Sequence, residues 1–190
     1  MIRFAFKFRK TLQAAAYLLR REPHREMNYM RLLKVLYIAD RESIRLSGRP
    51  ITGDRFVAMQ RGPVLSSVLD LIKGQECLPL EEQQWMDDWQ ECIERVDYSV
   101  QLARDPRPGA LSRFEIDILE RVAEEHRGKD EWEMVEFTHT LPEWIKNNPG
   151  DSARPIPIED VLEAVGRADD LADIEEDAEA DWAFEDVFGS

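Results

Sequence analysis

Cysteine and histidine are scarce in this sequence of 190 residues, which contains two cysteines and three histidines. Cys77 and Cys92 can form at most one disulfide bond, which excludes the disulfide framework of a small secreted domain. The pair lacks the Cys-x-x-Cys spacing of a zinc site, and His24, His126 and His139 are far apart along the chain. We therefore expect a reduced protein without a metal ion or another cofactor.

Long hydrophobic runs are also missing. No run of 18 or more apolar residues is long enough to cross a membrane as a helix. The opening segment, MIRFAFKFRK, mixes aromatic and basic residues and is unlike a signal peptide with a small-residue cleavage site. We expect a cytoplasmic protein with no membrane partner.

Patterns of catalytic residues are missing as well. The sequence has no glycine-rich phosphate loop. Ser66 and Ser67 lie inside a predicted helix, not on the strained turn that presents a nucleophilic serine. Most carboxylates belong to charge runs, which are usually solvated faces. The sequence therefore predicts no enzyme activity.

Charge is distributed unevenly along the chain, whose formal net charge is −14. Residues 1–73 contain 15 Lys or Arg against 6 Asp or Glu, whereas residues 159–190 contain 1 against 13. A basic first part and an acidic last part can attract each other within the molecule, or each can recruit a separate partner. Solvated faces of opposite sign are an equally good interpretation.

Helical periodicity is the main secondary-structure signal. Apolar residues recur at the i, i+3, i+4, i+7 spacing in several segments. Asn28 is a predicted helix cap, Gly48 a predicted helix end, and Ser112 with Glu115 a capping box. We predict helices at about 7–21, 28–46, 64–73, 81–89, from 112 to about 126, around 132–137, and from 158 to about 166.

Strands are predicted in two places. Residues 54–59 read as a short strand between turns, and Pro63 is placed at the first position of the helix that follows. Alternating apolar residues at 92–103 predict a hairpin that pairs with the 54–59 strand. The expected fold is mainly α with a small antiparallel β-sheet (α+β), a compact helical domain that includes a candidate winged-helix-like unit.

The last residues differ from the rest. Residues 169–190 are rich in carboxylates, have no Lys or Arg, and contain aromatic residues. We predict a domain at 1–168 and an acidic tail at 169–190. In that tail Trp182, Phe184 and Phe188 are candidate anchors for a basic groove on this chain or on a partner.

Asp40 is a candidate for a half-buried charge. By helical spacing it shares a face with Leu33 and Tyr37, and a carboxylate in that position needs a partner. We expect an ion pair with Arg49 or Arg55 that joins the helix to the following turn. Direct contact with a partner protein is the alternative.

One ordered set of motifs points to a family. The segment LLKVLYIADRE at 32–42 is followed by GRPITGD at 48–54, by Ala58, and by GPV at 62–64. A weaker continuation of the series consists of FTH at 137–139, LP at 141–142 and Trp144. In this order they resemble the Panacea (SocA-like) antitoxin domain. The resemblance implies that ten motif residues are structural or contact a toxin: Lys34, Tyr37, Asp40, Arg41, Arg49, Pro50, Gly53, Asp54, Gly62 and Pro63.

The resemblance also implies a function. Members of this family are antitoxins of bacterial toxin–antitoxin pairs; they neutralise a cognate toxin by direct binding, and some act as adaptors that deliver the toxin to a cytosolic protease. The alternative is a DNA-binding regulator or autorepressor that uses a winged-helix-like unit. DNA is the less favoured partner, because the whole molecule is strongly negative and counterion release requires basic side chains presented together.

Overall fold

The computed structural model describes residues 2–74 and 80–188, and of residues 80–83 and 184–188 only the backbone. Cys77 therefore lies outside the described residues. The elements follow one another as α1 (Phe8–Arg20), η1 (Pro23–Arg25), β1 (Glu26–Asn28), α2 (Tyr29–Ser47), β2 (Phe56–Met59), β3 (Gly62–Leu65), α3 (Ser66–Lys73), α4 (Leu80–Cys92), β4 (Ile93–Val96), β5 (Ser99–Leu102), α5 (Arg113–Glu125), α6 (Glu131–His139), α7 (Pro142–Lys146), β6 (Arg154–Pro155), α8 (Ile158–Ala164), η2 (Ala168–Asp170) and α9 (Leu171–Phe188).

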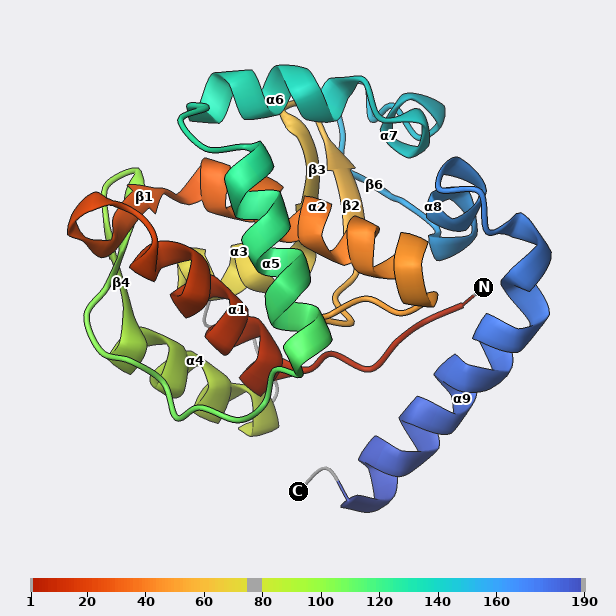
Figure 1. Cartoon of the computed structure of the whole chain (residues 1–190), viewed down its shortest axis with the longest axis horizontal. Coiled ribbons are helices and arrows are strands. Elements are labelled where there is room, and N and C mark those ends of the chain that lie inside the picture. Colours follow the sequence, from red (N-terminus) through yellow and green to blue (C-terminus); the bar gives the residue numbers. More distant parts are fainter. Residues whose placement is uncertain (1, 75–79, 189–190) are drawn as a thin grey trace.

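Helix α2 runs through the middle of the molecule (Figure 1). It contacts α1, α3, α5, α6 and α8 as well as strands β1 and β3. Leu32, Leu36 and Ile44 are buried, together with most other residues of the helix. Each large apolar side chain that is removed from water here contributes roughly 2 kcal/mol to folding. The prediction of a helix at about 28–46 is confirmed.

The helix ends agree with the predicted capping signals. The Asn28 side chain accepts a hydrogen bond from the backbone N of Met30 at 2.8 Å, and Gly48 ends α2 with a left-handed φ of 77°. Ser112 and Glu115 form both hydrogen bonds of a capping box at the start of α5. These caps are made within a few residues, so the sequence alone predicts them.

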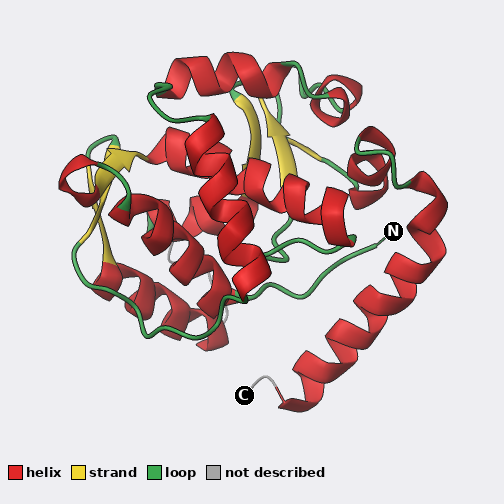
Figure 2. Ribbon diagram, viewed as in Figure 1, coloured by secondary structure: helices red, strands yellow, loops and turns green. Residues whose placement is uncertain are grey.

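Within the described residues, the strands form two small antiparallel sheets among the helices (Figure 2). One sheet has the order β1-β5-β4 and the other β3-β2-β6. The chain is therefore a helix-rich α+β protein, as predicted. The predicted pairing of the 92–103 hairpin with the 54–59 strand is wrong, because β5 pairs with β1 and β2 pairs with β3 and β6. A strand as short as β1 gives no periodicity that a sequence can reveal.

Pro63 lies in a strand, and the prediction that it starts a helix is wrong. It pairs with Ala58 in the ladder between β2 and β3, and the helix begins only at Ser66. Proline is tolerated in β3 because that strand is at the edge of its sheet, where a missing backbone N–H leaves no ladder partner unpaired.

Residues 171–188 of the acidic segment form helix α9. It lies along one side of the molecule, next to the extended residues that precede α1 (Figure 1). Ile174 and Ala178, one turn apart, are the buried apolar residues of this helix within the described side chains.

Candidate functional site

One side of α2 carries a row of polar residues into the interior. Lys34, Tyr37 and Asp40 are fully buried, and Arg41 is half-buried beside them. Buried charges and hydroxyls destabilise a fold unless each finds a hydrogen-bond partner. We call these residues, with Asp54, Glu143 and their partners, the buried framework.

Asp40 joins α2 to the turn that follows it. Its carboxylate accepts hydrogen bonds from the backbone N of Ile51 at 2.8 Å, the backbone N of Thr52 at 3.0 Å and the Thr52 hydroxyl. Burial raises the pKa of Asp40 to about 7, and the hydrogen bonds from Thr52 and Ile51 act in the opposite direction.

The predicted ion pair between Asp40 and an arginine is wrong. Arg49 is exposed, and its Nη2 atom lies 2.9 Å from Asp177 Oδ2 in α9. Arg55 is exposed as well. The turn folds back on α2 so that its own backbone N–H groups reach Asp40 and take the place of the expected arginine.

Gly53 allows the N-terminal segment to cross this turn. Its φ is 67°, and a Cβ atom added there would lie 1.9 Å from the carbonyl oxygen of Ala5. The backbone N of Lys7 donates to the carbonyl oxygen of Thr52 at 2.7 Å. The motif glycine is therefore required both for its left-handed conformation and for the close approach of another backbone.

Asp54 caps α3 from outside that helix. It accepts hydrogen bonds from the backbone N of Ser67 and of Val68, each at 3.0 Å. A carboxylate at a helix N-terminus pairs with free N–H groups and with the positive end of the helix dipole. Burial raises the pKa of Asp54, and these hydrogen bonds counteract part of that effect.

Lys34 reaches from α2 to the edge strand β3. Its Nζ atom donates to the carbonyl oxygen of Pro63 at 2.7 Å. A Cβ atom at Gly62 would lie 3.0 Å from Lys34 Nζ and 2.5 Å from the Thr138 hydroxyl oxygen, so glycine is needed where α2, β3 and α6 meet. Burial lowers the pKa of the Lys34 amine to about 7.

Glu143 of α7 completes the framework, and the sequence did not single it out. It is almost fully buried, and it accepts from Arg41 Nε at 2.7 Å and from the Tyr37 hydroxyl at 3.1 Å. Burial and the neighbouring Glu143 charge raise the pKa of Tyr37 well above its usual value. The sequence feature that could have identified Glu143 is its position between the motif residues Pro142 and Trp144.

The FTH and LP…W segments pack on the β2–β3 hairpin. The Trp144 Nε1–H donates to the carbonyl oxygen of Met59 at 3.2 Å. The rings of His139 and Trp144 stack with their centroids 4.1 Å apart. The predicted motifs, separated by many residues in the sequence, therefore meet in one region of the fold.

Burial limits the chemistry that this framework can perform. Lys34, Tyr37, Asp40, Asp54 and Glu143 are each at most 4% exposed, so a substrate in solution does not reach them. Eight of the ten predicted motif residues are buried; Arg41 is half-buried and Arg49 exposed.

In the described part of the chain, no group of three or more histidine, cysteine or acidic residues is placed to hold a metal ion. No helix among the described residues has the length and apolar character needed to cross a membrane.

Several large apolar side chains are exposed at the surface. Trp132 of α6 is 53% exposed and Ile145 of α7 is 57% exposed. The Arg61 guanidinium lies 5.3 Å from the centroid of the Trp132 ring. Tyr98 in the β4–β5 hairpin is 70% exposed.

The acidic helix α9 contacts the N-terminal segment. The Trp182 Nε1–H donates to the carbonyl oxygen of Arg3 at 2.8 Å, and Lys7 Nζ lies 3.0 Å from Asp181 Oδ2. These contacts join the acidic end of the chain to its basic beginning. The side chains of the other two predicted anchors, Phe184 and Phe188, lie outside the described part of the structure.

Residues 32–145 match the model of the family described as antitoxin SocA-like, Panacea domain. The matched stretch runs from α2 to α7 and contains the whole buried framework. The chain matches no curated protein and no solved structure. Because the match covers more than half of the 190 residues, the chain belongs to the SocA-like antitoxin family that the Panacea domain defines.

Proposed function

We propose that this protein is the antitoxin of a bacterial toxin–antitoxin pair and neutralises its cognate toxin by direct binding in the cytoplasm, without catalysis of its own. The observation that carries the proposal is the family match over residues 32–145. The burial of the ionisable motif residues supports it, because a rigid framework with inaccessible polar groups suits a binding protein better than an enzyme.

Co-expression tests the proposal directly. The product of the adjacent gene, expressed alone, should arrest growth, and co-expression with this chain should restore it. The two proteins should then co-purify. A neighbouring product that is harmless alone, or whose toxicity this chain does not relieve, contradicts the antitoxin role.

The toxin-binding surface in this proposal includes Trp132. Trp and Arg side chains are over-represented among residues that dominate binding energy, and Arg61 lies over the exposed Trp132 ring. Trp132→Ser should weaken toxin binding at least about tenfold. Tyr98→Ser is the control, since it removes another exposed aromatic ring, at the β4–β5 hairpin. Equal affinities of the two variants would remove Trp132 from the interface.

Delivery of the toxin to a cytosolic protease is the second part of the proposal. It predicts that the half-life of the toxin in cells shortens when the antitoxin is present. A toxin that is inhibited but equally long-lived supports simple blocking instead. We also propose that residues 1–168 form the Panacea-like helical domain and residues 169–190 an acidic tail that contains aromatic residues.

DNA binding by a winged-helix-like unit is the alternative function. The excess of basic residues in 1–73 favours it. However, Lys7, Lys10, Arg31, Arg41 and Arg45 all form ion pairs with carboxylates of this chain, which leaves fewer charges for phosphates. A sequence-specific gel shift that is strong at about 50 mM salt and weak at about 200 mM salt would favour this alternative.

A further inference from the structure

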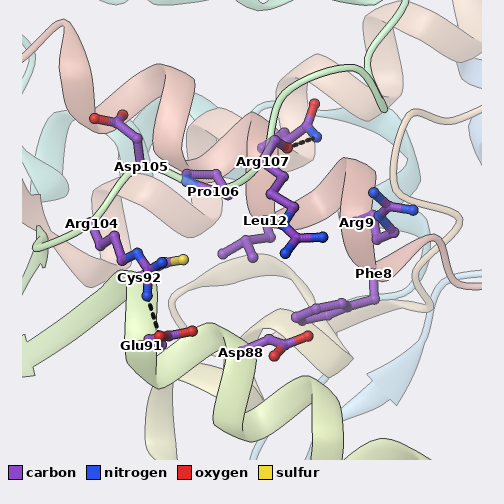
Figure 3. A pocket seen from close by; sticks show the side chains of 11 residues that line it. Phe8, Arg9, Leu12, Asp88, Glu91, Cys92, Arg104, Asp105, Pro106 and Arg107 are labelled. Atoms are coloured by element: carbon purple, nitrogen blue, oxygen red, sulfur yellow. Dashed lines mark hydrogen bonds and ion pairs between the residues drawn. The ribbon is translucent and has the colours of Figure 1, made fainter.

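A cavity opens between α1, α4 and the loop that leads from β5 to α5 (Figure 3). Its volume of about 480 Å³ lies in the range of small-ligand sites. Phe8 and Leu12 of α1 and Cys92 of α4 supply apolar lining and are buried. Burial raises the pKa of the Cys92 thiol, so this group is uncharged at neutral pH. We call this space the α1–α4 cavity.

The loop at the rim of the cavity is held at both ends. The buried Gln13 side chain donates to the carbonyl oxygen of Arg107 and accepts from the backbone N of Ala110 at 3.0 Å. Two residues before Arg107, Asp105 pairs with Arg25 at 2.7 Å and with Arg20 at 3.3 Å. A rim that is already ordered loses little conformational entropy when a ligand binds.

Three arginines and three carboxylates line the cavity, and we compare those that form no ion pair. Arg104 pairs with Glu91, whereas neither Arg9 nor Arg107 forms an ion pair with any described residue. Figure 3 shows Arg107 extending toward the middle of the cavity and Arg9 on the same side as Phe8. Asp88, on the α4 wall, accepts a hydrogen bond from Gln84 and is the one carboxylate in the cavity lining without an ion pair to a described residue. Asp105 is already paired with Arg20 and Arg25, which are not lining residues. The lining charges without an ion pair to a described residue are therefore two guanidiniums and one carboxylate, an excess of one positive charge.

We propose that the α1–α4 cavity is a binding site for a carboxylate on an apolar body, with the carboxylate at Arg9 and Arg107 and the apolar body against Phe8 and Leu12. Guanidinium groups match the planar geometry of a carboxylate and bind it through paired hydrogen bonds. Asp88 disfavours a dianion such as phosphate, because one excess positive charge balances only one negative charge. The carboxylate belongs either to a small organic acid or to a side chain or C-terminus of the toxin.

Three probes of the same shape test the charge preference on the full chain. Benzoate, benzamide and benzamidine are titrated separately, and binding is followed by the chemical shifts of the α1 and α4 amides. Benzoate should bind with millimolar or better affinity, and the neutral and cationic probes at least about tenfold more weakly. Equal binding of the three probes, or no benzoate binding at the cavity, overturns the proposal.

Charge variants then separate the site from a general surface effect. Arg107→Gln should weaken benzoate binding about three- to fivefold, as expected when one exposed ionic contact is lost. Asp88→Asn should strengthen it by a similar factor, since the repelling carboxylate is gone. Arg113→Gln, at an exposed position outside the cavity lining, is the matched control for net charge and should change nothing. If Arg107 only stabilised the fold, Asp88→Asn would not strengthen benzoate binding. Benzoate affinity that is unchanged or lower in Asp88→Asn therefore overturns the proposal.

The source of the carboxylate is decided with the toxin. If Arg107→Gln weakens both benzoate and toxin binding, the toxin supplies the carboxylate; if it weakens benzoate alone, a small acid is the ligand. Both results support the site. The benzoate experiments require no toxin, so the site and the antitoxin role fail independently of each other.

Discussion

Arg41 and Glu143 form an ion pair at 2.7 Å although 102 residues separate them. Glu143 is buried, and it also accepts a hydrogen bond from the Tyr37 hydroxyl, so one carboxylate connects α7 to two consecutive turns of α2. The family match begins inside α2, at residue 32, and ends at residue 145, just after Glu143. This pair therefore joins the two ends of the Panacea domain.

Loss of the Glu143 carboxylate should destabilise the protein strongly. Glu143→Ala leaves Arg41 and the Tyr37 hydroxyl without their partner, and we expect a loss of about 3 kcal/mol in the free energy of unfolding, measured by urea denaturation. The double variant Arg41→Met with Glu143→Met removes both charges and should lose less. A loss below about 1 kcal/mol for Glu143→Ala would show that the pair does not anchor α7.

Asp40 should be essential for the turn that it binds. Asp40→Ala leaves the buried backbone N–H groups of Ile51 and Thr52 unpaired, and we expect a loss of about 3 kcal/mol or more in the free energy of unfolding. Thr52→Val removes one of the three hydrogen bonds to Asp40 and also the one that the Thr52 hydroxyl accepts from the backbone N of Asp54 at 3.1 Å; it should cost about 1 to 2 kcal/mol. Thermal and urea unfolding of both variants measure the difference. Equal losses would mean that the backbone hydrogen bonds contribute little.

Lys34 should make stability depend on pH above neutrality. Its amine is neutral in the folded protein above about pH 7, whereas in the unfolded chain it keeps its proton up to about pH 10.5. The unfolded state therefore binds more protons between these values, and the free energy of unfolding should rise by roughly 1.4 kcal/mol per pH unit in that window.

Lys34→Met provides the reference for this pH effect. It removes the titrating group while keeping a long side chain, so the difference in unfolding free energy between the two proteins isolates Lys34. The curves of both proteins are measured in urea at pH 7.5, 8.5 and 9.5. Parallel curves would show that the buried amine keeps its proton.

Gly53 should tolerate no side chain. In Gly53→Ala the new Cβ atom would overlap the Ala5 carbonyl oxygen, and φ is positive as well. We expect a loss of about 3 kcal/mol or more in the free energy of unfolding. Gly128→Ala is the matched control, with a φ of 76° and open space around the added atom, and should cost about 1 kcal/mol. Similar losses would indicate that the N-terminal segment moves away at little cost.

Deletion of residues 169–190 tests the acidic segment. Removal of α9 takes away the hydrogen bond between Trp182 and Arg3 and the ion pair between Lys7 and Asp181. We expect a lower thermal midpoint, a change in toxin affinity, or both, and Trp182→Ala should reproduce part of the effect. An unchanged midpoint together with unchanged affinity contradicts an anchoring role for this segment.

Local signals made most of the helices predictable. The periodicity of 28–46, the Asn28 cap and the Ser112–Glu115 capping box involve residues within a few positions of one another, and the structure has all three. The resemblance carried by residues 32–64 also identified the family. The start of α3 was predicted too early, because Pro63 is equally compatible with the first turn of a helix and with an edge strand.

Pairing across long distances was not predictable. The strand β1 has three residues and no alternation, yet it pairs with β5 more than 70 residues later. The arginine expected to pair with Asp40 was chosen from formal charge, whereas the structure uses the backbone N–H groups of Ile51 and Thr52. Every residue carries such groups, so no residue type marks them in a sequence.

The sequence by itself determined the helical segments, their caps and the family, because amphipathic spacing and capping depend on neighbours along the chain. The tertiary structure decided which buried charge meets which partner, where the strands pair, and that Arg9 and Arg107 line one cavity. Those relationships depend on how distant segments pack. Many arrangements satisfy the same hydrophobic pattern, and the hydrogen-bonding needs of Lys34, Asp40 and Glu143 are met only when all the elements are in place.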